Sequence, residues 1–260
     1  TLFRSNLSNS KIKLIRSLRQ KKFRQETGLF AVEGTKLVEE ALHSSFEVES
    51  VYRKEDIGEH TMQRISSMSS PSPILALVRQ KNLSLSDIPL QKGRLYLALD
   101  GLRDPGNLGT IIRIAEWFGV SAVFCSHDTV ELYNPKTVQA TMGALFRLSV
   151  VYCNLSDLFS KAGSLDVPVW GTFLDGTPVT SDKQALKEMG RGSVIVLGNE
   201  SEGISDPVSK LIGRKNHILI PSFRTDGAPK DSQRFQGSES LNVATACAAI
   251  LSLVRATGSV

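Results

Sequence analysis

The chain has 260 residues, of which 41% are hydrophobic, and a formal net charge of +5. This content supports a real hydrophobic core in one large or two unequal domains, without extensive disorder. The longest apolar runs have the length of a strand, so we expect no membrane span, and residues 1–24 lack the apolar stretch of a signal peptide. Three widely spaced cysteines are typical of a reduced cytosolic protein without disulfides.

Positive charge is concentrated near the N-terminus. No acidic residue precedes Glu26, whereas eight cations do: Arg4, Lys11, Lys13, Arg16, Arg19, Lys21, Lys22 and Arg24. Such an arm releases counterions from a polyanion, so nucleic acid is the first partner to consider. The alternative is a helix whose charges face solvent while Ile12, Leu14, Ile15 and Leu18 dock it on the body.

Residues 1–90 are predicted to form a small α/β domain. After the basic helix, the hydrophobic pattern predicts strands at 29–34, 48–53 and 73–80, a helix at 35–44 and a polar helix between the last two strands. The segment 84–93 mixes Ser, Pro and Gly, and is the best candidate for a linker to the next domain.

Residues 91–260 show a more regular pattern of apolar runs that alternate with helical segments. The runs are 94–100, 122–126, 148–153, 167–173, 193–199 and 217–222. The helices expected between or after them are 109–118, 135–146, 183–190, 206–213 and an Ala-rich helix at 240–258 with Ser240 as its N-cap. Nearly continuous apolar strands separated by helices predict a parallel sheet that is covered on both faces.

The stretch DPGNLGTIIRIAEWFG, residues 104–119, follows the first strand of this second domain. Its first four residues fit a β-turn in which Pro105 sets φ and Gly106 or Asn107 takes a positive φ. The helix is then expected to begin near Leu108. This turn would lie at the carboxyl end of a parallel strand, where such sheets bind ligands.

Arg113 projects from this helix on the side opposite its apolar residues. A surface ion pair with Glu116, three residues further on, accounts for an arginine at this position. A role at the ligand-binding edge of the sheet accounts for it equally well. Spacing alone leaves both interpretations open.

Two further segments bring small polar residues to the ends of apolar runs. The apolar run at 193–199 ends in Gly198 and Asn199, Glu200 comes next, and a glycine at a strand end lets a ligand approach the backbone. Ser240 and Asn242 stand at the start of the last helix, where capping explains at least one of them and where an anionic group would also bind favourably.

Other chemistry is poorly supported by the sequence. Gly101 and Gly106 have the spacing of a phosphate-binding loop but lack its Lys and Ser/Thr, and no dinucleotide fingerprint occurs. No hydrolase elbow or paired metal-ligand motif is present, so we expect no metal. The polar segment 222–239 is a long loop, whose Arg224, Lys230 and Arg234 either meet phosphates or are solvated.

Taken together and in this order, the motifs resemble the SpoU, or TrmH-like, branch of the SPOUT RNA 2′-O-ribose methyltransferases. LRDPGNLGTIIRIAEWFG looks like the first family motif, IVLGNESEGIS the second, and ILIPS with SLNVATACAAI the third. RQETGLFAVEGTKLVEEAL is similar to the small substrate-binding domain of many rRNA-modifying members. The resemblance covers nearly the whole chain.

The resemblance implies an α/β fold with a parallel sheet and a C-terminal trefoil knot that binds S-adenosylmethionine, mainly through backbone groups. The residues that match the family's cofactor contacts are Leu197, Gly198, Ile220 and Leu241, with Asn199 beside them. The residues that match its polar catalytic or site-shaping positions are Arg113, Asn107, Glu200, Ser240 and Asn242. It further implies RNA as substrate, rRNA rather than tRNA because of the N-terminal domain, and a cytoplasmic homodimer without metal.

The family assigns the role of base to the arginine that Arg113 matches. An arginine side chain stays protonated at pH 7, so neutral guanidine is scarce and stabilisation of developing alkoxide charge is the alternative that we prefer. The loop before Ser240 is longer than the family's usual connection, which leaves its packing open. A non-catalytic RNA-binding or ribosome-assembly protein on the same fold is the competing function.

Overall fold

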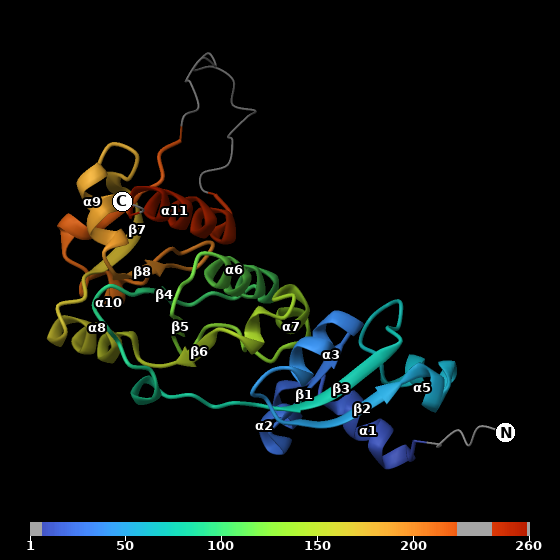
Figure 1. Ribbon diagram of the computed structural model, residues 1–260. Coiled ribbons are helices and arrows are strands. Elements are labelled where there is room, and N and C mark those ends of the chain that lie inside the picture. Colours follow the sequence, from blue (N-terminus) through green and yellow to red (C-terminus); the bar gives the residue numbers. More distant parts are fainter. Residues whose placement is uncertain (1–6, 223–240, 259–260) are drawn as a thin grey trace.

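Six parallel strands form the larger sheet of the molecule (Figure 1). The computed structural model describes residues 7–222 and 241–258. The strands are β4 (Leu95–Leu99), β5 (Ala122–Cys125), β6 (Ser149–Tyr152), β7 (Val169–Pro178), β8 (Ser193–Leu197) and β9 (His217–Leu219). Their order is β6-β5-β4-β8-β7-β9, and every neighbouring pair is parallel. The predicted parallel sheet is therefore confirmed, and all its carboxyl ends lie along one edge.

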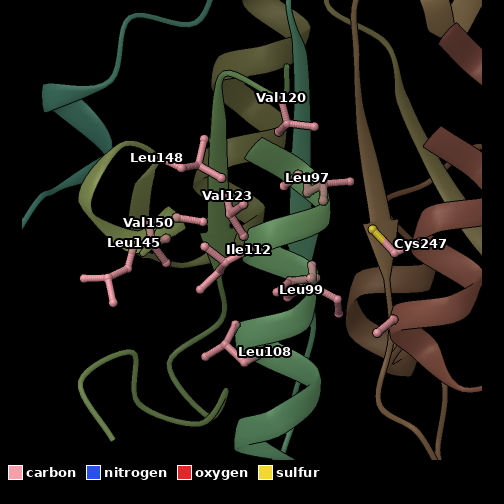
Figure 2. Packing of buried hydrophobic residues seen from close by; sticks show 14 of the residues in the cluster. Leu97, Leu99, Leu108, Ile112, Val120, Val123, Leu145, Leu148, Val150 and Cys247 are labelled. Carbon is pink, nitrogen blue, oxygen red and sulfur yellow. The ribbon is translucent and has the colours of Figure 1, made fainter. Parts of the chain in front are cut away.

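Helices cover both faces of this sheet. One face carries α6 (Pro105–Trp117), α7 (Pro135–Ala140), α9 (Lys183–Gly190) and α11 (Val243–Gly258), and the other carries α8 (Leu155–Ser164) and α10 (Asp206–Ser209). The alternation along β4 shows the two layers, because Leu97 and Leu99 pack with α6 whereas Tyr96 packs with α8. Figure 2 shows Leu108 of α6 in the same cluster as Leu99.

A smaller antiparallel sheet stands at the N-terminal end, in the order β1-β3-β2. Its strands are β1 (Leu29–Glu33), β2 (Val48–Arg53) and β3 (Ile74–Arg79). The helices around it are α1 (Asn9–Ser17), α2 (Lys21–Thr27), α3 (Thr35–Leu42), α4 (Lys54–Ile57) and α5 (Glu59–Ile65). All three strands and the helix at 35–44 were predicted within two residues of their bounds.

The basic N-terminal segment is docked on this sheet. Ile12, Ile15 and Leu18 are buried against residues of α5 and β3. Among the cations of this segment that the structure describes, Arg24 is buried, with only 2% of it exposed. Its guanidinium donates two hydrogen bonds to the Glu131 carboxylate, at 2.9 and 2.5 Å, so Arg24 has a structural role instead of the solvent-facing one expected from the run of charge.

The two sheets share one hydrophobic core. The rings of Phe30 in β1 and Tyr133 before α7 lie 4.5 Å apart, and the Tyr133 hydroxyl bonds to both the N–H and the C=O of Lys81. The candidate linker 84–93 is not a loose connection, because it contains the 3₁₀ turn η1 (Leu85–Asp87) and buries Ile88 and Leu90. The division at residues 90 and 91 stays a prediction.

Several predicted elements of the second domain have different bounds in the structure. The helix expected at 135–146 ends at Ala140 and is followed by the 3₁₀ turn η2 (Ala144–Phe146), because Met142 and Gly143 have positive φ. The helix expected at 206–213 is only the four residues of α10, with η3 (Arg214–Asn216) after it. Helix α8 was not among the expected helices. The C-terminal trefoil knot stays a prediction, because residues 223–240 lie outside the described residues.

Candidate active site

Helix α6 begins at Pro105, earlier than expected. The Asp104 carboxylate accepts a hydrogen bond from the Asn107 N–H at 2.7 Å, which makes Asp104 the N-cap with Pro105 at the first helical position. Neither Gly106 nor Asn107 has a positive φ, so the predicted β-turn is wrong. The DPGN residues instead form the first helical turn, and Asn107 is held on it beside the carboxyl end of the sheet.

Three of the predicted polar residues meet at this point. The Asn107 Nδ2 donates to Glu200 Oε1 at 2.9 Å, and the Asn107 Oδ1 accepts from Asn242 Nδ2 at 3.0 Å. They come from α6, from the loop after β8 and from the start of α11, which are far apart in sequence. Asn107 is thus the central member of a polar cluster that we name the Asn107–Glu200–Asn242 triad.

Asn242 is also the cap of α11. Its Oδ1 accepts hydrogen bonds from the N–H groups of Ala244 and Thr245, at 3.0 and 3.3 Å. This capping, which the sequence assigned to Ser240, leaves the Asn242 Nδ2 free to donate to Asn107. Ser240 lies outside the described residues, and its place in the site stays a prediction.

Helices α6 and α11 run side by side and are connected at both ends (Figure 1). Asn242 reaches Asn107 at their N-terminal ends. At the other end, Arg255 of α11 donates to the carbonyl oxygens of Phe118 and Gly119, at 2.7 and 2.8 Å. A cation at the last carbonyls of a helix is favourable, and the two connections fix α6 relative to α11.

The loop that carries Glu200 is a tight turn. Asn199 and Gly203 exchange two backbone hydrogen bonds, and the Asn199 Oδ1 accepts from the Ser201 N–H at 2.8 Å. Gly198 precedes this turn, and a Cβ on it would lie 2.1 Å from the carbonyl carbon of Gly203. The missing side chain therefore makes room for the chain's own backbone, and the ligand contact expected at Gly198 stays a prediction.

Two of the predicted cofactor residues have backbone groups that are free to bind a ligand. Neither Gly198 nor Ile220 makes a backbone hydrogen bond to another residue in the described parts of the chain. Leu197 is buried at the end of β8, Ile220 packs against the main core, and Leu241 is 53% exposed. Asn199 differs from them, because its Nδ2 already donates to the Gly101 carbonyl at 2.7 Å. The free backbone groups fit a cofactor that is held mainly by the main chain.

Arg113 is exposed and does not pair with Glu116. Glu116 instead accepts a hydrogen bond from Arg147 at 2.8 Å, and Arg147 also bonds to Glu40 of α3. Arg113 makes no hydrogen bond or ion pair with any described residue. It follows Asn107 by six residues, about 9 Å along the helix, so the structure does not bring Arg113 into the triad. The ion-pair interpretation of Arg113 is wrong, and its functional role stays a prediction.

Asp100 is a residue of the site that sequence reasoning missed. It follows β4 directly and is only 6% exposed, and its Oδ2 accepts from the Ser205 N–H at 2.8 Å. The sequence feature that could have indicated it is an acidic residue directly after a continuous apolar run, at the carboxyl end of a predicted strand. Within the described residues, no group of three potential metal-ligating side chains occurs, and no helix is long and apolar enough to cross a membrane.

A parallel α/β sheet with polar residues from three chain segments at its carboxyl edge is the arrangement expected of an RNA methyltransferase of the resembled class. Comparison with known families agrees with this class. Residues 94–225 match the SpoU rRNA Methylase family, and residues 9–74 match the MRM3-like substrate binding domain. The chain belongs to the SpoU rRNA methylase family.

Individual relatives match over almost the whole chain. The 23S rRNA (guanosine(2553)-2′-O)-methyltransferase RlmP of Bacillus subtilis is 28% identical and covers 94% of this chain and 95% of its own. A Porphyromonas gingivalis structure assigned to the TrmH family is 32% identical, with a TM-score of 0.78 over 97% of this chain and 99% of its own. The AdoMet-bound rRNA methyltransferase of Sinorhizobium meliloti is 30% identical, with a TM-score of 0.81 over 96% of both chains.

Proposed function

We propose that this protein is an S-adenosylmethionine-dependent RNA 2′-O-ribose methyltransferase that acts on rRNA. The observation that carries the proposal is the Asn107–Glu200–Asn242 triad, in which the polar residues of three separate motifs bond to one another at the carboxyl edge of the sheet. Membership of the SpoU rRNA methylase family and the 2′-O-methyltransferase among its relatives support the same reaction.

The free backbone groups of Gly198 and Ile220, after β8 and β9, would hold the cofactor together with Leu197 and Leu241. S-adenosylmethionine supplies an electrophilic methyl group when it is bound. The chain's own residues must then align the ribose 2′-hydroxyl and assist the loss of its proton, because a hydroxyl is a poor nucleophile. In this proposal the triad orients the ribose through Glu200 and Asn107.

Arg113 stabilises the negative charge that develops on the ribose oxygen. A guanidinium that stays protonated at pH 7 does this without first losing a proton, whereas the alternative role as base requires a site that favours the neutral form. The exposed position of Arg113, without a partner among the described residues, leaves its guanidinium available to an RNA phosphate or ribose.

The N-terminal domain, residues 1–90, binds the RNA, and residues 91–260 form the catalytic domain. The docked α1 and α2 expose Lys13, Arg16 and Lys21, which have no ion-pair partner in the described chain. Exposed cations on docked helices suit contacts to phosphates. The match of residues 9–74 to a substrate binding domain supports rRNA over tRNA.

The protein acts in the cytoplasm as a homodimer. Support for a dimer comes from Trp117, which is 82% exposed at the end of α6. Large aromatic side chains are enriched at protein interfaces, and a second copy seated there would bring its own surface close to Arg113, four residues away on the same helix. Sedimentation of the purified protein measures this state directly.

A titration with S-adenosylmethionine, followed by transfer of its radiolabelled methyl group to total RNA, tests the proposed function. We expect saturable cofactor binding and incorporation of label into RNA. The competing function, a non-catalytic RNA-binding or ribosome-assembly protein, predicts that RNA is bound but remains unlabelled with cofactor present. That result would contradict the proposal.

A further inference from the structure

The loop that carries Glu200 is attached to the rest of the site at both of its ends, and both attachments reach the corner where β4 ends. At the first end, the Asn199 Nδ2 donates to the Gly101 carbonyl at 2.7 Å. At the second end, the Ser205 N–H donates to the Asp100 carboxylate at 2.8 Å. Glu200 stands between them, at the turn closed by the Asn199–Gly203 bridge.

Asp100 is suited to hold the loop because its own position is fixed. It is 6% exposed, and its backbone N–H donates to the Leu197 carbonyl at 2.9 Å, which extends the pairing of β4 with β8. No ion pair to Asp100 occurs in the described chain, so its carboxylate is used for a backbone hydrogen bond. A charged acceptor makes such a bond roughly twice as strong as a neutral one.

The same corner leads directly into α6. Three residues after Gly101, Asp104 caps the helix by accepting a hydrogen bond from the N–H of Asn107. The corner at residues 100–101 therefore sets the positions of both partners in the hydrogen bond between Asn107 and Glu200, whose length is 2.9 Å. A shift of either partner by about 1 Å is enough to reduce a reaction rate up to about a hundredfold.

We propose that Asp100 is a positioning residue for methyl transfer, which holds the Glu200 loop through the Ser205 N–H so that Glu200 meets Asn107. The proposal rests on the proposed function. Asp100 acts through Glu200 and touches neither RNA nor cofactor, so its loss lowers the rate of the bound complex and leaves the affinity for S-adenosylmethionine nearly unchanged.

Single-turnover methyl transfer to RNA by Asp100→Ala, with the dissociation constant for S-adenosylmethionine measured in parallel, tests this role. We expect a rate about tenfold to a hundredfold lower with an affinity within about threefold of the wild type. Asp100→Asn keeps an oxygen acceptor for the Ser205 N–H and restores most of the rate. Asp166→Asn, in an exposed ion pair with Lys92, is the matched control and keeps the wild-type rate.

Combination with Glu200→Gln separates positioning from a general effect on folding. If Asp100 acts through Glu200, the double variant is no slower than Glu200→Gln alone, within about twofold. Rate losses that multiply would overturn the proposal, as would an Asp100→Ala variant at the wild-type rate or an Asp100→Asn variant as slow as Asp100→Ala. A wild-type protein that transfers no methyl group is a different outcome, which contradicts the proposed function itself.

If Asp100→Ala does not fold, as judged by its thermal melt, Asn199→Asp tests the other attachment of the loop. This isosteric change keeps the oxygen that accepts from the Ser201 N–H and replaces the donor to the Gly101 carbonyl with a carboxylate oxygen, which repels that carbonyl. We expect the same loss of rate and the same non-additivity with Glu200→Gln. A wild-type rate in this variant would overturn the proposal that the corner at residues 100–101 positions Glu200.

Discussion

The Asn242 Nδ2 donates to the Asn107 Oδ1 at 3.0 Å, so the cap of α11 is bonded to the first turn of α6. Asn107 uses its two side-chain atoms in opposite senses, because its Nδ2 donates to Glu200 while its Oδ1 accepts from Asn242. Only a side chain with a donor and an acceptor in this arrangement satisfies both neighbours.

Asn107→Asp therefore breaks the triad without changing its shape. The new carboxylate cannot donate to Glu200 and repels it, and we expect methyl transfer to fall by about a hundredfold, in the range seen when one polar group of an active site is removed. Single-turnover rates measure this loss. Asn154→Asp is the control, because Asn154 caps α8 through an oxygen that aspartate retains. A variant with the wild-type rate would show that the triad has no catalytic importance.

Replacement of Arg113 by lysine keeps the positive charge and removes the planar fork of donors. We expect Arg113→Lys to lose most of its methyl transfer while the affinity for S-adenosylmethionine stays unchanged. Arg191→Lys, at an exposed arginine that ends α9, serves as the control. A rate close to that of the wild type would exclude any central role for Arg113, whether as base or as stabiliser of charge.

Gly198→Ala tests the close approach of β8 to the Glu200 loop. The added methyl carbon would lie 2.1 Å from a backbone atom of Gly203, so the loop must move. We expect loss of cofactor affinity and a fall in the free energy of unfolding of about 2 kcal/mol or more, as for overpacked cores. Both are measurable by calorimetry and urea unfolding.

Gly163→Ala is the matched control for this substitution. Gly163 lies in α8, where an added Cβ meets no atom within 4 Å. Alanine in such a helix position stabilises by roughly 0.5–1 kcal/mol. Equal effects of the two substitutions would contradict the packing that we describe at Gly198.

The ion pair of the buried Arg24 with the partly buried Glu131 connects the N-terminal helices to the loop after β5. Removal of one partner leaves an uncompensated charge, so we expect Arg24→Met or Glu131→Leu alone to lower the free energy of unfolding by about 3–5 kcal/mol. The double variant recovers much of this loss, because two apolar side chains replace the pair. Additive losses in urea unfolding would contradict the pairing. The exposed pair of Lys92 and Asp166 is the control, worth at most about 1 kcal/mol.

Much of the fold follows from the sequence because each buried strand is a continuous apolar run. β4 and β8 are buried at every position and were readily predicted. Short-range polar contacts were harder to predict from the sequence. The Asp-Pro pair at 104–105 fits both a β-turn and a helix start, and only the hydrogen bond from Asn107 to Asp104 distinguishes them.

The sequence motifs indicated the polar residues of the triad but not the hydrogen bonds between them. The order of the motifs indicated Asn107, Glu200 and Asn242, yet which of them bond depends on how the strands are arranged in the sheet. Local spacing misled at Glu116, whose partner is Arg147, 31 positions along the chain. Local spacing also missed Asp100, because Asp100 accepts its hydrogen bond from the Ser205 N–H, which is distant in sequence.

A map of 2′-O-methylated positions in rRNA, from cells with the protein and cells without it, tests the central claim most directly. We predict one or more rRNA positions that carry the mark only when the protein is present, and that regain it when purified protein and S-adenosylmethionine are added to the unmodified RNA. Identical rRNA maps, or loss of a mark from tRNA alone, would contradict the proposed function.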